Sequence, residues 1–130
     1  MIVLDASAAL EVLLRTEAAS AVGRLIFDRR TSLHAPHLID LEIAQVLRRY
    51  STSGKITGTR GKQALEDLID FPLTRYPHDF LLPRIWELRR NVTAYDAAYL
   101  ALAEALGAVL VTRDARLGAA PGCRARVLVV

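Results

Sequence analysis

Apolar residues in this chain fall into short unbroken runs, which alternate with longer stretches where they recur every three or four positions. Short continuous runs are typical of strands covered on both faces, and the longer stretches predict amphipathic helices. The predicted strands are residues 2–4, 32–36, 71–76, 109–111 and 127–130. The predicted helices open at residue 6 and then cover 18–30, 38–50, 58–70, 77–90 and 94–106. This order predicts an α/β fold: a three-layer α/β/α sandwich with a mainly parallel central sheet of about five strands, formed by residues 1–130 as a single domain.

Residues 91–114 carry the clearest local signals. The segment 94–106 is rich in Ala and Leu, which favours a helix, and Gly107 ends it. Thr93 and Asp96 have the spacing of a capping box, which places Asp96 in the first turn of that helix. The strand that follows is succeeded by Asp114. Ligands bind at the carboxyl ends of strands in open parallel sheets, so we expect Asp96 and Asp114 to lie at one edge of the sheet.

Two further acids are candidates for the same edge. Asp5 directly follows the first predicted strand, with Ser7 two residues later. An N-cap role for Asp5 or Ser7 is an alternative that needs no function. Glu42 lies beside the apolar stripe of the predicted helix 38–50, where a carboxylate is unusual unless it is paired or bound to a metal ion. The alternative for Glu42 is an edge position from which its side chain reaches water.

Taken together, Asp5, Glu42, Asp96 and Asp114 predict a metal site. Several carboxylates in one place repel one another, and without a counter-charge some of them take up protons. A divalent cation resolves this repulsion, and oxygen-only ligands indicate Mg²⁺ or Mn²⁺ rather than zinc or copper. Such a site can activate a water molecule and stabilise charge on a phosphoryl oxygen.

The charge balance favours nucleic acid as the substrate. The chain has 17 Lys and Arg against 14 Asp and Glu, a formal net charge of +3. Cations bound to the acids would leave a still more basic surface, which attracts polyanions. Arg113 and Arg116 flank Asp114 and are candidates for holding RNA phosphates. The remaining basic residues considered have a solvated helical face as the simpler interpretation: Arg48, Arg49, Lys55, Arg60 and Lys62.

Nothing in the sequence predicts a membrane protein. No apolar run reaches the roughly 18 to 20 residues that a membrane span requires, and the first residues lack the features of a signal peptide. The single cysteine, Cys123, cannot form an internal disulfide, which is compatible with a reducing compartment. We therefore expect a cytoplasmic protein without membrane contact.

Four motifs resemble those of the PIN-domain family, specifically its VapC-type toxin ribonucleases. They are Ile-Val-Leu-Asp5-Ala-Ser-Ala, Glu42 ahead of Val46-Leu47-Arg48, Asn91-Val-Thr-Ala-Tyr-Asp96-Ala-Ala-Tyr and Val111-Thr112-Arg113-Asp114. The resemblance implies a PIN-like fold and an acidic quartet at Asp5, Glu42, Asp96 and Asp114. It further implies supporting roles for Ser7, Thr112 and Asn91, the last by orienting the site.

The same resemblance implies an activity and partners. It implies Mg²⁺- or Mn²⁺-dependent endoribonuclease activity within a toxin–antitoxin pair, a homodimer, and inhibition by a VapB-type antitoxin, a segment of which enters the active site. The main alternative is a PIN-like module that binds RNA or protein without cleaving, against which the complete quartet counts. A DNA nuclease with the same metal chemistry is a further alternative, although so short a chain lacks obvious elements for holding a DNA junction.

Other reaction classes fit the sequence less well. A ribonuclease based on histidine needs two positioned histidines, whereas ordinary structural or surface roles are expected for His34, His37 and His78. A phosphoaspartyl hydrolase of the haloacid dehalogenase type needs an aspartate two residues after the first, where Ser7 stands. No glycine-rich loop follows a strand, which argues against a Walker-type nucleotide site.

Overall fold

The computed structural model describes residues 1–130 and contains one five-stranded sheet in which every neighbouring pair of strands is parallel. The strands are β1 (Ile2–Leu4), β2 (Leu33–Pro36), β3 (Leu73–Tyr76), β4 (Val109–Thr112) and β5 (Arg126–Val129), in the order β3-β2-β1-β4-β5. The helices are α1 (Ala6–Leu13), α2 (Ala19–Ile26), α3 (Leu38–Thr52), α4 (Gly58–Ile69), the 3₁₀ turn η1 (Asp79–Leu81), α5 (Leu82–Glu87), α6 (Ala94–Leu106) and α7 (Ala115–Gly118). The predicted α/β class and parallel sheet are confirmed.

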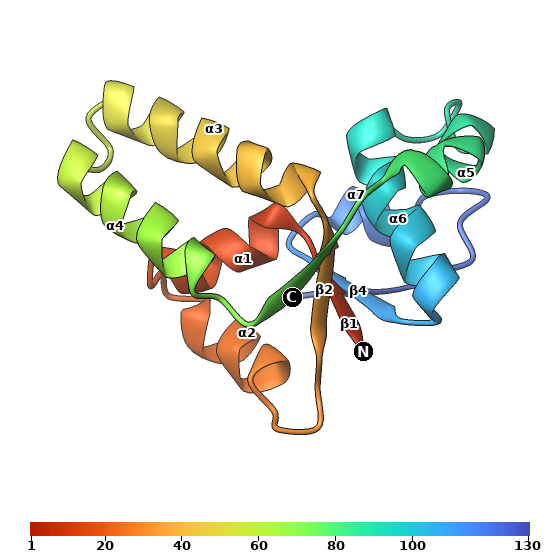
Figure 1. Ribbon diagram of the computed structural model, residues 1–130, viewed down its shortest axis with the longest axis horizontal. Coiled ribbons are helices and arrows are strands. Elements are labelled where there is room, and N and C mark those ends of the chain that lie inside the picture. The colour runs from red at the N-terminus through yellow and green to blue at the C-terminus, as the bar shows by residue number, and fades with distance from the viewer.

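The helices lie on both sides of the sheet (Figure 1). Helices α1 and α2 cover one face, and α3 and α4 form a long antiparallel hairpin that extends beyond α1. Helix α6 packs against β1, β2 and β4 from the other face, with α5 beside it. The sheet is therefore the middle of three layers, and its carboxyl edge lies where α1, α3 and α6 begin.

The burial of the strands explains why the sequence shows unbroken apolar runs. All residues of β1 and β2 are buried, as are three of the four in β4, because helices cover both faces of these inner strands. The outer strands β3 and β5 contain no fully buried residue, which matches the prediction of an edge strand at residues 71–76. A core of 28 buried apolar residues extends over both faces of the sheet. No helix of the structure has both the length and the apolar character that a membrane crossing requires.

Helix α6 has the ends that its sequence predicts. The Thr93 hydroxyl accepts a hydrogen bond from the backbone N–H of Asp96 at 3.2 Å, which caps the first turn. Gly107 ends the helix with φ of +61°, a left-handed conformation that glycine adopts at little cost. Seven consecutive residues, Ala97–Ala103, are buried, so α6 is enclosed along its middle. These caps fix where Asp96 enters the site.

Three predicted helix limits are wrong. The helix predicted over 18–30 ends at Ile26, because the Asp28 carboxylate accepts the backbone N–H of Arg30 and turns the chain instead. The helix predicted over 77–90 is a 3₁₀ turn followed by the short α5, because Pro83 near its start cannot continue a helix from residue 77. Helix α3 continues to Thr52, two residues into the segment expected to be a loop.

We predict that Leu100→Ala lowers the free energy of unfolding by about 2 to 5 kcal/mol, because Leu100 is fully buried and its truncation leaves a cavity in the core. Leu41→Ala, at a side chain that is 77% exposed, is the control and should change stability by less than about 1 kcal/mol. Urea unfolding followed by circular dichroism measures both. Equal effects of the two substitutions would contradict the placement of α6 in the core.

Candidate active site at the carboxyl edge of the sheet

Asp5 is the buried anchor of the site, since only 6% of its surface is exposed. It follows β1 and is the N-cap of α1, where its Oδ1 accepts hydrogen bonds from the Ser7 hydroxyl at 2.6 Å and the Ala8 N–H at 3.0 Å. Its Oδ2 accepts a hydrogen bond from the Thr112 hydroxyl on β4. The N-cap alternative is therefore correct for Asp5, and the same carboxylate lies at the predicted edge.

Ser7 and Thr112 link Asp5 to the loop after β4. The Ser7 Oγ accepts the N–H of Arg113 at 2.9 Å, and the Thr112 Oγ1 accepts the N–H of Asp114 at 3.0 Å. The two hydroxyl oxygens are 3.3 Å apart, and each donates its proton to Asp5. These contacts hold the loop that carries Asp114 next to Asp5.

Glu42 reaches the edge from the second turn of α3. Its Oε1 accepts a hydrogen bond of 2.5 Å from the hydroxyl of Tyr99, a buried residue of α6. Sequence reasoning assigned no role to Tyr99, although it lies three residues after Asp96 and therefore on a neighbouring part of the same helical face. Tyr99 fixes one carboxylate oxygen of Glu42 at the junction of α3 and α6.

Asp96 and Asp114 lie on the other side of this group. Asp96 is half-buried in the first turn of α6. Asp114 is the N-cap of α7, and its carboxylate accepts hydrogen bonds from the backbone N–H of Arg116 at 2.9 Å and from Nη2 of that residue at 2.8 Å. Arg116 therefore neutralises Asp114 in this arrangement.

The four carboxylates share one electrostatic environment. Burial raises the pKa of Asp5, Glu42 and Asp96 above their ordinary values, and each rise is increased by a neighbouring acid of the group. In contrast, the hydrogen bonds from Arg116 lower the pKa of Asp114. The structure thus brings all four predicted acids to one edge. For three of them, Asp5, Glu42 and Asp96, burial and repulsion destabilise the ionised form.

The donor set suits a hard divalent cation, because it consists of carboxylate oxygens whose mutual repulsion such an ion would relieve. However, no group of three or more His, Cys, Asp or Glu side chains is close enough together to hold a metal ion. Glu42 is engaged by Tyr99 and Asp114 by Arg116. Binding of an ion by three of these acids would therefore require side-chain rearrangement.

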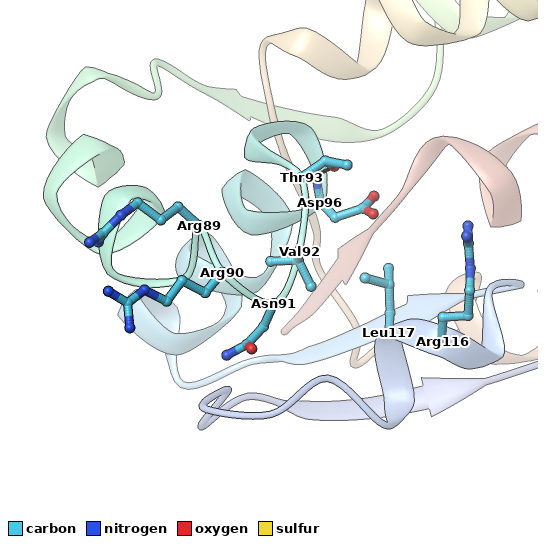
Figure 2. Close-up of a pocket in the computed structure, with 8 residues that line it drawn as sticks. All are labelled: Arg89, Arg90, Asn91, Val92, Thr93, Asp96, Arg116 and Leu117. Atoms are coloured by element: carbon cyan, nitrogen blue, oxygen red, sulfur yellow. Dashed lines mark hydrogen bonds between the residues drawn. The ribbon is translucent and has the colours of Figure 1, made fainter.

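Two cavities of different character border the acids, one lined by Asp96 and the other by Glu42. The first, of about 470 Å³, is mainly polar; Figure 2 shows its lining residues, among them Asp96 and three arginines, Arg89, Arg90 and Arg116. The second, of about 690 Å³, lies between α1 and α3 beside Glu42 and has a mainly apolar lining that includes Leu10, Leu41, Val46, Tyr50 and Tyr95. The acids are thus reached from a basic side and from an apolar side.

The remaining predicted site residues have contacts of other kinds. Arg113 forms an ion pair with Glu11 at 3.4 Å and donates to the Val130 carbonyl, so its guanidinium is directed along α1 and the end of the chain. The Asn91 amide donates to the Pro121 carbonyl at 3.0 Å, and it makes no hydrogen bond with the four acids. Asn91 therefore connects two loops beside the site.

The side chain of His34 is engaged by two hydroxyl groups. His34 is buried on β2, with Nε2 at 2.8 Å from the Ser32 hydroxyl and Nδ1 at 2.6 Å from the Tyr76 hydroxyl. Burial lowers the pKa of this histidine, which favours the neutral ring. This environment agrees with the ordinary structural role expected for His34.

We predict that Asp96→Asn raises the metal-free melting temperature at neutral pH by roughly 2 to 4 °C. The folded-state pKa of Asp96 is raised above 3.8, so the wild type loses stability as pH rises from about 4 through that raised pKa, whereas the variant has no such loss. The difference should therefore be small in acid and grow with pH. Thermal unfolding in EDTA across this range tests it, and a less stable variant at neutral pH would mean that the Asp96 carboxylate supports the fold.

Comparison with known proteins agrees with this architecture. Residues 2–122 match the PIN domain family. The chain is 50% identical to the VapC ribonuclease Mb0985 of Mycobacterium bovis over 90% of its own length and 88% of that protein. It is 41% identical to the ribonuclease VapC1 of Mycobacterium tuberculosis, covering 98% of this chain and 96% of the relative.

The crystal structure of VapBC2 from Rickettsia felis, bound to a DNA fragment from its promoter, shares the fold with a TM-score of 0.70 at 14% identity, covering 98% of each chain. The chain therefore belongs to the PIN-domain family and, within it, to the VapC ribonucleases.

Proposed function

We propose that this protein is the toxin of a toxin–antitoxin pair, an endoribonuclease that hydrolyses RNA phosphodiester bonds with a metal-activated water held by Asp5, Glu42, Asp96 and Asp114. The observation that carries the proposal is the coupling of these carboxylates at one edge of the sheet, next to a cavity bordered by arginines. The names of relatives that are 41% to 50% identical support RNA as the substrate. Because RNA is the substrate, we place the activity in the cytoplasm.

We assign a role in catalysis to each residue of the site. Asp5 and Asp96 are assigned to hold Mg²⁺ or Mn²⁺, with Glu42 and Asp114 beside them. The bound ion would supply Lewis-acid stabilisation of the phosphoryl oxygen and lower the pKa of water. Ser7 and Thr112 orient the Asp5 carboxylate, and Tyr99 orients Glu42. Arg116 is free to exchange its contact with Asp114 for one with a phosphate, since its side chain is 88% exposed.

The apolar cavity supports the antitoxin part of the proposal. It reaches from Tyr50 on α3 to Ser7 and Glu42, so an apolar segment of a VapB-type antitoxin lying there would block the acids. The VapBC2 complex of Rickettsia felis supports an antitoxin as partner. We also propose a homodimer, for which the exposed Ile69 of α4 and Phe80 of η1 are candidate contacts.

The purified protein should cleave RNA only when Mg²⁺ or Mn²⁺ is present, and Asp96→Asn should reduce the rate roughly 100-fold or more, the scale expected for loss of one electrostatic catalytic group. Asp67→Asn, at an exposed position of α4, is the matched control and should retain full activity. Gel analysis of cleaved RNA measures the rate, and end-labelling identifies the termini. Attack by water should leave 5′-phosphates and 3′-hydroxyls.

Two results would oppose the proposal. A 2′,3′-cyclic phosphate product would mean that the RNA 2′-hydroxyl is the nucleophile. RNA binding without any cleavage in either metal would favour the alternative of a non-cleaving PIN-like module.

Tyr99→Phe should shift the acidic limb of the pH–rate profile to higher pH. The lost hydrogen bond favours the ionised Glu42 carboxylate, so its removal raises the pKa of Glu42 further and less of the active form remains at neutral pH. Cleavage should therefore be lost more steeply than in the wild type as pH falls, and it should recover at higher pH. Tyr95→Phe is the control, because its hydroxyl is exposed and forms no hydrogen bond. A uniform loss at every pH would assign Tyr99 to packing alone.

A further inference from the structure

The junction between α5 and α6 carries positive charge that the rest of the fold does not use. Arg89 and Arg90 are both exposed and line the polar cavity that also contains Asp96. Neither forms an ion pair, whereas Arg75, Arg84, Arg113 and Arg116 each pair with a carboxylate. Arg90 makes no side-chain hydrogen bond at all, so its guanidinium donors are open to a ligand.

Arg89 is held in position without being neutralised. Its guanidinium lies over the ring of Trp86, 4.6 Å from the centroid, and its Nη1 donates to the Trp86 carbonyl at 2.9 Å. Both partners are uncharged, so the full positive charge remains available. The stacked arrangement also reduces the side-chain entropy that binding would otherwise cost.

The backbone under these arginines is fixed as well. Asn91 donates to the Pro121 carbonyl, and the Val92 N–H donates to the Leu88 carbonyl at 3.2 Å. From α5, Arg84 donates to the Gly122 carbonyl at 2.7 Å and pairs with Glu104 of α6 at 2.7 Å. The junction is therefore joined to the loop before β5 and to α6, which places its arginines at a constant position relative to Asp96.

The directions of the side chains show which part of a substrate they would meet. In Figure 2 the Asp96 carboxylate points toward the side of Arg116, whereas Arg89 and Arg90 extend in the opposite direction. They are therefore directed away from the reacting centre. A polyanion that passes the acids and continues over this junction would meet them beyond the reacting phosphate.

We infer that Arg89 and Arg90, on the α5–α6 junction, form a subsite that binds the backbone phosphates of single-stranded RNA on one side of the scissile bond. The inference rests on the proposed ribonuclease function and adds the direction in which the strand leaves the acids. Two adjacent unpaired guanidinium groups beside a polar cavity match a ligand with closely spaced negative charges. The cavity beside Glu42 is also lined by Arg49 and Arg113, but Arg113 is paired with Glu11, so only one unpaired cation faces the strand there.

Binding of a fluorescently labelled, mixed-sequence single-stranded RNA oligonucleotide in EDTA tests the subsite without cleavage. The double substitution Arg89→Gln and Arg90→Gln should weaken binding by roughly tenfold or more and reduce the slope of log affinity against log salt by about 1.4, because each phosphate contact to a single strand contributes about 0.7. In the wild type, the same titration should change the fluorescence of Trp86, the only tryptophan of the chain.

The matched control is the double substitution Arg29→Gln and Arg30→Gln. These two adjacent arginines are also exposed, and they precede β2 at the opposite end of the sheet, at the bottom of Figure 1. The control removes the same charge and should leave the affinity within about twofold and the salt slope nearly unchanged. Equal losses in both double variants would overturn the subsite and indicate a general effect of net charge.

Cleavage in Mn²⁺ separates binding from catalysis. The Arg89 and Arg90 double variant should show a raised KM with kcat within about twofold of the wild type, because the lost contacts lie away from the reacting phosphate. A fall in kcat at unchanged KM would overturn the inference. Conversion of a dimer to a monomer by this variant alone, measured by light scattering at unchanged RNA affinity, would also overturn it and assign the arginines to a subunit contact. Absence of cleavage by the wild type would instead refute the proposed function, while the binding result would still decide the subsite.

Discussion

Negative charge is concentrated at one end of the parallel sheet, and the contacts that hold it there determine the geometry of the site. Asp5 is the most constrained member, because it is buried at the end of β1 and receives hydrogen bonds from Ser7, Ala8 and Thr112. Those hydrogen bonds lower its pKa, but burial outweighs them and keeps the pKa raised. The loop after β4 is positioned by the same hydroxyl groups, so the geometry of Asp114 follows from how Asp5 is held.

The surroundings of the acids differ sharply on their two sides. The cavity that contains Asp96 is polar and basic, and the one beside Glu42 is mainly apolar. A polyanion in the first cavity and an apolar peptide segment in the second would approach the acids from different sides. They would compete only for the space directly at the acids. This separation allows inhibition by a protein whose chemistry does not resemble that of the substrate.

Ion pairs hold the part of the fold that borders the polar, basic cavity. Arg84 forms ion pairs with Glu87 and Glu104, and its remaining contact reaches the Gly122 carbonyl. Both ion pairs neutralise the Arg84 guanidinium within the fold, and the hydrogen bonds that it donates to the carboxylates of Glu104 and Glu87 raise its pKa. Arg90 lies nearby in sequence and has no such partner, so the same residue type serves structure at one position and remains available at another.

Local sequence was sufficient to predict the strands, both ends of α6 and the placement of Asp5 after β1, because each is governed by neighbours a few residues away. The parallel sheet was predicted from the alternating order of strands and helices along the chain. The break at Pro83 is also a local signal, although the apolar residues around it recur at helical spacing. The contact between Glu42 and Tyr99, 57 residues apart, required α3 to pack against α6. Likewise, the sequence indicated which acids meet at the edge, whereas the orientation of their side chains, which keeps any three from sharing an ion, was decided only by the tertiary contacts around them. The physical reason is that backbone propensities act over one turn, whereas side-chain partners are chosen by the packing of distant elements.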